Sequence, residues 1–277
     1  MSAKRLIRRA TMQLKDKTIL LTGATGGIGE ALALRLVKQG ATLVITGRNA
    51  DKLQRLQARI LANGGRCRSV VADISLEAGI SIVAQEAARV PQVNMLINNA
   101  GVSDFIEFED QSAERIRCLM EANVTGPMLL TQRLLPQLRI QQGMIVNIGS
   151  TFGSIGYPGF AAYCASKFAM RGFSEALQRE LADSPMQVLY VAPRATRTTI
   201  NSSAVESMNA ELGNRMDEPD WVAEQICAAI IRRTPRVYLG WPEKLFVRIN
   251  ALFPALVAVS ISKQLPIIRK YLARQNT

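Results

Sequence analysis

Short apolar runs alternate along the chain with longer segments whose apolar residues recur every three or four positions. The run KTILLTG at 17–23 ends in glycine, and the segment GGIGEALALRLVKQG that follows has helical spacing up to Gly40. The run ATLVITG at 41–47 has the pattern of a second strand. Together these segments predict one strand–helix–strand unit with parallel strands.

The same alternation continues to about residue 240. Further strands are predicted at about 68–72, 93–97, 143–148, 186–191 and 236–239. With the first two runs these make seven strands, separated by helical segments. The pattern predicts an α/β protein of the Rossmann type: a doubly wound, seven-stranded parallel sheet with helices on both faces. Ligands of such sheets bind at the carboxyl ends of the strands.

Nothing in the sequence divides these strands and helices into separate domains. The sequence has no internal repeat, low-complexity segment or long linker, so 1–277 is expected to form a single domain. It carries a basic N-terminal arm at 1–15 and a C-terminal extension, expected to be helical, at about 242–277.

The amino-acid composition limits which residues can transfer protons or bind a metal. The chain has no histidine, so a residue of another type must carry protons near neutral pH. The four cysteines are widely spaced and form no C-x-x-C pair, which argues against zinc and for a reducing compartment. We expect no metal site.

The formal net charge of +12 is concentrated at the two ends. Residues 1–17 have six basic side chains against one acidic, and residues 242–277 have the same balance. No nucleic-acid recognition motif accompanies this charge, so nucleic acid is not an expected partner. Two interpretations stay open: contact with an anionic membrane surface, or solvated tails.

The two ends of the chain also indicate where in the cell the protein is expected. MSAKRLIRRA has no apolar segment after its charges, so no secretory signal is expected. The most apolar window, at 245–261, is too short for an ordinary spanning helix and contains Arg248, Asn250 and Pro254. We expect a cytoplasmic protein, with membrane association through the basic ends as the open alternative.

The stretch TGATGGIG at 22–29 lies between a strand and a helix, where a glycine-rich turn brings backbone close to a pyrophosphate. Gly23, Gly27 and Gly29 fit G-x-x-x-G-x-G, whereas Gly23, Gly26 and Gly29 fit G-x-x-G-x-x-G. Methyltransferases and flavoproteins use similar turns, so this motif alone leaves the ligand open.

Arg48 follows the second strand, where an NAD enzyme usually places an acidic residue for the ribose hydroxyls. A guanidinium suits a 2′-phosphate, so the sequence favours NADP(H) over NAD(H). A solvated surface arginine is the alternative. The next signal, NNAG at 98–101, follows another strand. Asparagine amides there can join neighbouring strand ends.

Tyr163 and Lys167, in YCASK, are four residues apart and lie on one face of a helix. A neighbouring ammonium favours phenolate, so the pair can exchange a proton with a carbonyl or alcohol oxygen without histidine. Chance can also place a tyrosine and a lysine four apart on a helix.

Further motifs argue against a chance pairing of Tyr163 and Lys167. Ser150 ends the strand segment GMIVNIGS, and Asn123 lies in the helical stretch before that strand. TGATGGIG, ADI, NNAG, Asn123, NIGS and YCASK occur in the order and approximate spacing of the short-chain dehydrogenase/reductase family, which the chain resembles over about 16–240. Its length and NNAG favour the compact, single-domain branch.

The resemblance implies roles for individual residues. Tyr163 is the catalytic acid/base, and Lys167 lowers its pKa and holds the nicotinamide ribose. Ser150 binds the substrate oxygen, and Asn123 anchors a water that relays protons to Lys167. Asp73 contacts the adenine and Arg48 binds the 2′-phosphate. The expected cofactor-binding residues are Thr22, Gly23, Thr25, Gly26, Gly27, Ile28, Gly29, Arg48, Asp73, Ile74, Asn99, Ala100, Gly101, Tyr163, Lys167, Pro193 and Thr198.

One position departs from the family pattern. The family usually has Pro-Gly after the sixth strand, where this chain has Pro193-Arg194. A large side chain here is expected to fold over the cofactor or to narrow the site. Thr198, five residues past the proline, matches a family threonine and is a candidate partner for the nicotinamide carboxamide.

These features predict an NADPH-dependent oxidoreductase acting on a small carbonyl or secondary alcohol, in a homo-oligomer. A dinucleotide-binding sensor or scaffold without turnover is the alternative, supported only by Arg194. The apolar residues after Trp241 leave three roles open for the extension: to cap the pocket, to contact another copy or to dock on lipid. Docking would favour a lipophilic substrate.

Overall fold

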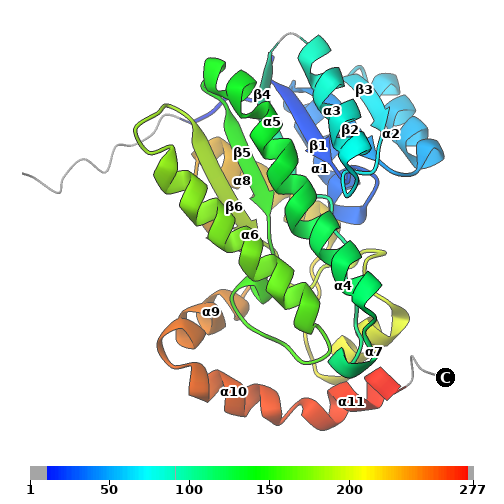
Figure 1. Ribbon diagram of the computed structural model, residues 1–277, viewed down its shortest axis with the longest axis vertical. Helices are drawn as coiled ribbons and strands as arrows, with labels where there is room; N and C mark the ends of the chain where they lie inside the picture. The colour runs from blue at the N-terminus through cyan, green and yellow to red at the C-terminus, as the bar shows by residue number, and fades with distance from the viewer. Residues whose placement is uncertain (1–10, 91, 274–277) are drawn as a thin grey trace, which may run out of the picture.

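A computed structural model describes residues 11–90 and 92–273 (Figure 1). Its seven strands form one sheet in which every neighbouring pair is parallel, in the order β3-β2-β1-β4-β5-β6-β7. The strands are β1 (Thr18–Thr22), β2 (Thr42–Gly47), β3 (Arg66–Val71), β4 (Val93–Asn98), β5 (Met144–Ile148), β6 (Gln187–Ala192) and β7 (Arg236–Tyr238). The predicted seven-stranded, doubly wound Rossmann-type sheet is confirmed.

Helices cover both faces of this sheet, and three more follow β7 (Figure 1). The α-helices are α1 (Gly27–Lys38), α2 (Ala50–Ala62), α3 (Glu77–Arg89), α4 (Ala113–Met120), α5 (Gly126–Ile140), α6 (Ala161–Glu180), α7 (Ser203–Glu211), α8 (Pro219–Arg232), α9 (Glu243–Leu252), α10 (Pro254–Ser262) and α11 (Leu265–Ala273). Short 3₁₀ turns occur at η1 (Phe108–Asp110) and η3 (Thr151–Gly153), and η2 (Glu121–Thr125) is a π-helical turn between α4 and α5.

The two faces of the sheet have separate cores because successive strand residues point to opposite sides. On β1, Ile19 and Leu21 pack in one core with α1, α2 and α8. Leu20 between them packs in the other core, with α3, α5 and α6. The strands are therefore apolar on both faces, as expected of a parallel sheet covered by helices.

Only the last residues of the predicted basic arm at 1–15 lie within the described part of the chain. Residues 1–10 lie outside the described residues. Leu14 is buried in the core, and the backbone N–H of Met12 donates to the carbonyl of Ile231 at 2.8 Å. The last residues of the predicted arm thus pack on the helical layer at α8.

The C-terminal extension is helical, as predicted, through α9, α10 and α11. Figure 1 shows these helices, coloured orange to red, as a band at one end of the molecule. Ile268 and Leu272 of α11 pack against Val205 and Met208 of α7, in a third apolar cluster that includes Phe160. Within 11–90 and 92–273, no helix is long and apolar enough to span a bilayer.

Candidate active site

Two adjoining cavities lie at the carboxyl edge of the sheet. The first is a groove of about 580 Å³, and the second is a cavity of about 430 Å³. Ile28, Asn99, Gly101 and Thr198 line both, so the two spaces meet there. The groove brings together most of the predicted cofactor residues: Thr22, Gly23, Thr25, Gly26, Gly27, Ile28, Gly29, Arg48, Asp73, Ile74, Asn99, Ala100, Gly101 and Thr198. Ser150, Tyr163, Lys167 and Pro193 line the second cavity.

The packing of the glycine turn resolves its ambiguous spacing. A Cβ on Gly23 would lie 2.6 Å from the Cα of Ala100, and one on Gly29 would lie 2.2 Å from the Gly23 carbonyl oxygen. A Cβ on Gly27 would meet Thr198 at 2.7 Å, whereas on Gly26 its nearest neighbour would be 3.5 Å away. Close packing therefore demands glycine at Gly23, Gly27 and Gly29, the G-x-x-x-G-x-G reading.

The N-terminus of α1 fits a bound pyrophosphate. The residue before the helix is Gly26, and no side chain caps the helix there. The first N–H groups of α1 therefore face the groove without a side-chain acceptor, and the positive end of the helix dipole favours an anion at this place.

Asparagine side chains join the strand ends, as the sequence indicated. The Asn98 amide donates to Asn147 Oδ1 on β5 at 2.9 Å. The Asn99 amide donates to the backbone carbonyls of Thr22 and Gly23 at 3.1 and 3.0 Å. These bonds hold the NNAG turn against the glycine turn and leave Ala100 and Gly101 at the wall of the groove.

Two basic side chains line the groove near Asp73. Arg48 is largely exposed and its guanidinium is 3.9 Å from the carboxylate of Asp73. The other oxygen of Asp73 accepts from the backbone N–H and the hydroxyl of Ser75. Lys52 of α2 lines the same groove and was not among the predicted residues. Its position one turn beyond Arg48, at the start of a helix, could have indicated it.

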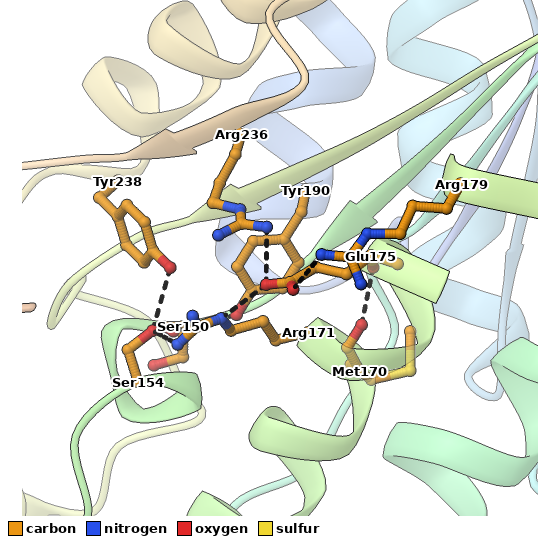
Figure 2. A network of polar contacts seen from close by, with 10 residues as sticks. Ser150, Ser154, Met170, Arg171, Glu175, Arg179, Tyr190, Arg236 and Tyr238 are labelled. Carbon is orange, nitrogen blue, oxygen red and sulfur yellow. Dashed lines mark hydrogen bonds and ion pairs between the residues drawn. The ribbon is translucent and has the colours of Figure 1, made fainter. Parts of the chain in front are cut away.

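Ser150 is held by a polar network on the side of α6 and β7 (Figure 2). The Tyr190 hydroxyl donates to the Ser150 backbone carbonyl at 3.3 Å. Arg171 of α6 donates to the Ser154 hydroxyl at 2.9 Å and to Glu175 at 3.1 Å. Ser154 in turn contacts the Tyr238 hydroxyl at 3.1 Å. The loop that carries Ser150 is thereby fixed to α6, β6 and β7.

Tyr163 lies near the start of α6, at the wall of the second cavity. Burial raises its pKa to about 12, and its interaction with the Ser150 hydroxyl lowers it by less. The Lys167 ammonium lies 5.6 Å from the centre of the tyrosine ring. Because burial outweighs the hydrogen bond with Ser150, Tyr163 is a protonated phenol at neutral pH.

Lys167 is buried, and burial lowers its pKa to about 8. Its ammonium donates to the Ile148 carbonyl at 3.4 Å. No carboxylate of the described residues pairs with it, which leaves the positive charge directed at the cavity. Such a buried cation favours a neighbouring anion, whether a phenolate or a bound ligand.

Asn123 occupies the π-helical turn η2, a local feature often found at functional sites. Its carbonyl oxygen accepts from the Val102 N–H at 2.8 Å. Its amide donates to the Val102 carbonyl at 2.9 Å and to the Ser166 hydroxyl at 3.0 Å. The side chain thus joins the segment after NNAG to α6, beside Lys167. Its predicted role in holding a water stays a prediction.

Arg194, which takes the place of the usual family glycine, is held by two acidic side chains. Its side chain is almost fully buried and donates to both carboxylate oxygens of Asp217. It also donates to the Trp241 carbonyl and to Glu243, both at 2.9 Å. The guanidinium therefore joins the loop after β6 to the start of the extension. Arg194 lines the second cavity, and Asp217, Trp241 and Glu243 hold its guanidinium. The expectation that it folds over the cofactor or narrows the site stays a prediction.

The walls of the second cavity are mainly apolar. They include Phe152 and Phe160 beside Tyr163, Met208 from α7, and Val257 and Ile261 from α10. The sequence indicated the apolar residues after Trp241 as a possible cap, whereas Phe152 and Phe160 were not among the predicted residues, since only the fold brings them to the cavity. The extension thus caps this cavity, which is one of the three roles left open for it.

Comparison with known proteins agrees with this arrangement. The family profile described as "short chain dehydrogenase" matches residues 17–209. Dehydrogenase/reductase SDR family member 7 of Homo sapiens is 33% identical over 235 residues, which cover 81% of this chain and 68% of that protein.

Solved structures share the fold. A short-chain dehydrogenase from Sphingobium yanoikuyae in complex with NADPH has a TM-score of 0.75 at 29% identity, covering 88% of this chain and 95% of that one. A short-chain dehydrogenase/reductase from Burkholderia phymatum in complex with NAD has a TM-score of 0.80 at 22% identity, covering 88% and 96%. The family profile and the human relative show that this chain belongs to the short-chain dehydrogenase/reductase family.

Proposed function

We propose that this dehydrogenase/reductase uses NADPH to reduce the carbonyl group of a lipophilic substrate, and that it also catalyses the reverse alcohol oxidation. The observation that carries the proposal is that Ser150, Tyr163 and Lys167 line one apolar cavity that adjoins the glycine-turn groove. NADPH, when bound, supplies the hydride that reduces the carbonyl carbon.

The groove residues fit such a dinucleotide. The glycine turn and the uncapped start of α1 would hold the pyrophosphate, and Asp73 and Ile74 would lie at the adenine. Arg48, with Lys52 beside it, would bind the 2′-phosphate and so favour NADP(H) over NAD(H). Asn99, Pro193 and Thr198 would border the nicotinamide end.

Each catalytic side chain has a distinct task. Tyr163, protonated at neutral pH, donates its hydroxyl proton to the carbonyl oxygen as the carbon is reduced. Ser150 donates a hydrogen bond to the same oxygen and stabilises the negative charge that develops on it. Lys167 stabilises the resulting phenolate and binds the ribose, and Asn123 holds the backbone beside Lys167.

The alternative of a sensor or scaffold without turnover is not favoured. Its only support was Arg194, and the guanidinium of that side chain is engaged by Asp217, Trp241 and Glu243. We further propose a homo-oligomer in the cytoplasm, with peripheral contact to anionic membrane.

The test is consumption of NADPH or NADH by the purified protein with small ketones, aldehydes, acyl β-ketones and steroids. The expected result is turnover of apolar carbonyls, with kcat/KM at least about tenfold higher with NADPH than with NADH. Tight NADPH binding with no turnover of any carbonyl would favour the non-catalytic role. Equal use of both cofactors would contradict the role given to Arg48.

A further inference from the structure

The outer side of α9 and α10 carries an exposed apolar surface. It consists of Trp241, Leu245, Phe246, Leu252, Phe253, Leu256 and Val259, called here the tail patch. Leu252 is 73% exposed and Leu256 65%. Of the seventeen large hydrophobic side chains exposed in the described chain, these seven fall within 19 consecutive residues. Such a concentration marks an interaction surface rather than scattered exposure.

α10 is apolar on all sides. Its sequence, PALVAVSIS, contains no charged residue. Only Val257 is buried, and Ile261 is partly buried, both at the cavity. The opposite side, with Leu256 and Val259, faces outward at the end of the molecule where α9, α10 and α11 form their band (Figure 1). A helix that is hydrophobic all round normally has apolar surroundings on both sides.

Exposed cations flank this patch. Lys244 and Arg248 lie on α9, Lys263 follows α10, and Arg269 lies on α11; all four are exposed. Within the described part of the chain, none of the four forms an ion pair. The acidic residue in this segment, Glu243, is engaged by Arg194. The flanks are therefore positively charged without internal compensation.

Charge distinguishes between the two partners that an apolar patch can take. In a symmetric dimer through this face, the cations of one copy would lie against the same cations of the other, and like charges repel. An anionic bilayer instead offers apolar chains to the leucines and phenylalanines and negative headgroups to the flanking cations. Exposed tryptophan also suits the boundary between lipid and water.

The patch is continuous with the substrate cavity. Trp241 and Phe246 are exposed members of the tail patch and also line the cavity that contains Ser150 and Tyr163. Val257 and Ile261, on the inner side of α10, line the same cavity. An apolar path therefore leads from the outer face of the extension to the catalytic hydroxyl groups.

We propose that the tail patch docks on an anionic lipid surface, and that the substrate passes from the bilayer into the cavity beside α9 and α10. The substrate class is then a carbonyl compound that partitions into lipid. The second half of this proposal rests on the proposed reductase function, whereas the docking itself does not.

The docking is tested by flotation of full-length protein with vesicles of phosphatidylcholine, with or without about one quarter phosphatidylserine. The wild type is expected to float with the anionic vesicles. Phe253→Asp/Leu256→Asp, two positions outside the cavity wall, is expected to bind at least about tenfold more weakly. Ile140→Asp, at an even more exposed position at the end of α5, is the control and is expected to bind like the wild type.

Three results would overturn the docking. The first is wild-type protein that stays with the soluble fraction. The second is equal binding by wild type and the double variant. The third is a wild-type dimer that the double variant converts to monomer while vesicle binding is absent, which would assign the patch to a second copy.

The path is tested by turnover of a long-chain aldehyde held in vesicles and of a small water-soluble ketone. The double variant is expected to lose about tenfold in kcat/KM on the vesicle-borne aldehyde and to retain wild-type turnover of the soluble ketone. Equal loss on both would overturn the path. Intact docking with no turnover of either substrate by the wild type would instead refute the reductase function and leave the docking standing.

Discussion

Arg194 and Asp217 form a bidentate ion pair in which both side chains are more than nine-tenths buried. The Nε–Oδ2 and Nη2–Oδ1 distances are 2.9 and 2.7 Å. The hydrogen bond to Asp217 is the main reason that the pKa of the guanidinium is raised. Because Arg194 also reaches Trp241 and Glu243, one side chain connects the loop after β6, the segment before α8 and the start of α9.

Arg194→Gly, which restores the usual family residue, is expected to destabilise the protein. It leaves the Asp217 carboxylate buried without its cation, at a cost of about 3–5 kcal/mol in the free energy of unfolding. The measurement is equilibrium unfolding in urea. Arg197→Ala is the matched control, since Arg197 pairs with Glu218 on the surface and is expected to cost less than about 1 kcal/mol. Equal losses in the two variants would contradict the structural role of Arg194.

Arg48→Ala is expected to raise the KM for NADPH about 10- to 100-fold and to change the KM for NADH little. The change removes the charge-assisted contact with the 2′-phosphate, which NADH lacks, and a 3.9 Å surface ion pair with Asp73. Initial rates with both cofactors provide the measurement. Arg55→Ala is the control, because Arg55 is an exposed arginine of α2 that does not line the groove. A similar rise with both cofactors would place Arg48 on another part of the dinucleotide.

Lys167→Met is expected to stabilise the protein at neutral pH while impairing catalysis. The pKa of Lys167 is about 8 when folded and near 10.5 when unfolded, so between these values the unfolded chain binds the extra proton. The stability of the wild type therefore rises with pH in this window, and Lys167→Met lacks that rise.

The measurable quantity is the difference in unfolding free energy between Lys167→Met and the wild type. It is expected to favour the variant below pH 8 and to fall by about 3 kcal/mol by pH 10.5. Because the other titrating groups are the same in both proteins, their contributions to the unfolding free energy cancel when the two are compared at each pH. A difference that stays constant with pH would contradict a desolvated Lys167.

The sequence predicted the sheet because each strand is an apolar run and each crossover helix begins or ends at recognisable residues such as Gly40. It also placed the site, because Gly23, Asn99 and Ser150 follow strands whose carboxyl ends share one edge. These signals are local, and neither tertiary packing nor distant partners had to be known to read them.

Arg194 shows what could not be predicted. Its partners Asp217 and Glu243 lie 23 and 49 residues along the chain, so no local pattern indicated where the guanidinium would point. The raised pKa of Tyr163 depends likewise on burial by residues from several segments. The course of α10 across the cavity depends on the packing of α11 against α7, which the sequence pattern did not specify.

The most direct test of the proposed chemistry follows deuterium from NADPH that carries deuterium at both C4 positions of the nicotinamide into the product, with wild type and Tyr163→Phe compared. The phenylalanine ring keeps the packing but removes the proton donor, and NADPH binding measured by fluorescence confirms an intact groove. Wild type is expected to give an alcohol with one deuterium on the carbinol carbon. Tyr163→Phe is expected to form it about 10²–10⁴-fold more slowly. Unlabelled product from the wild type, or labelled product from Tyr163→Phe at the wild-type rate, would contradict hydride transfer assisted by Tyr163.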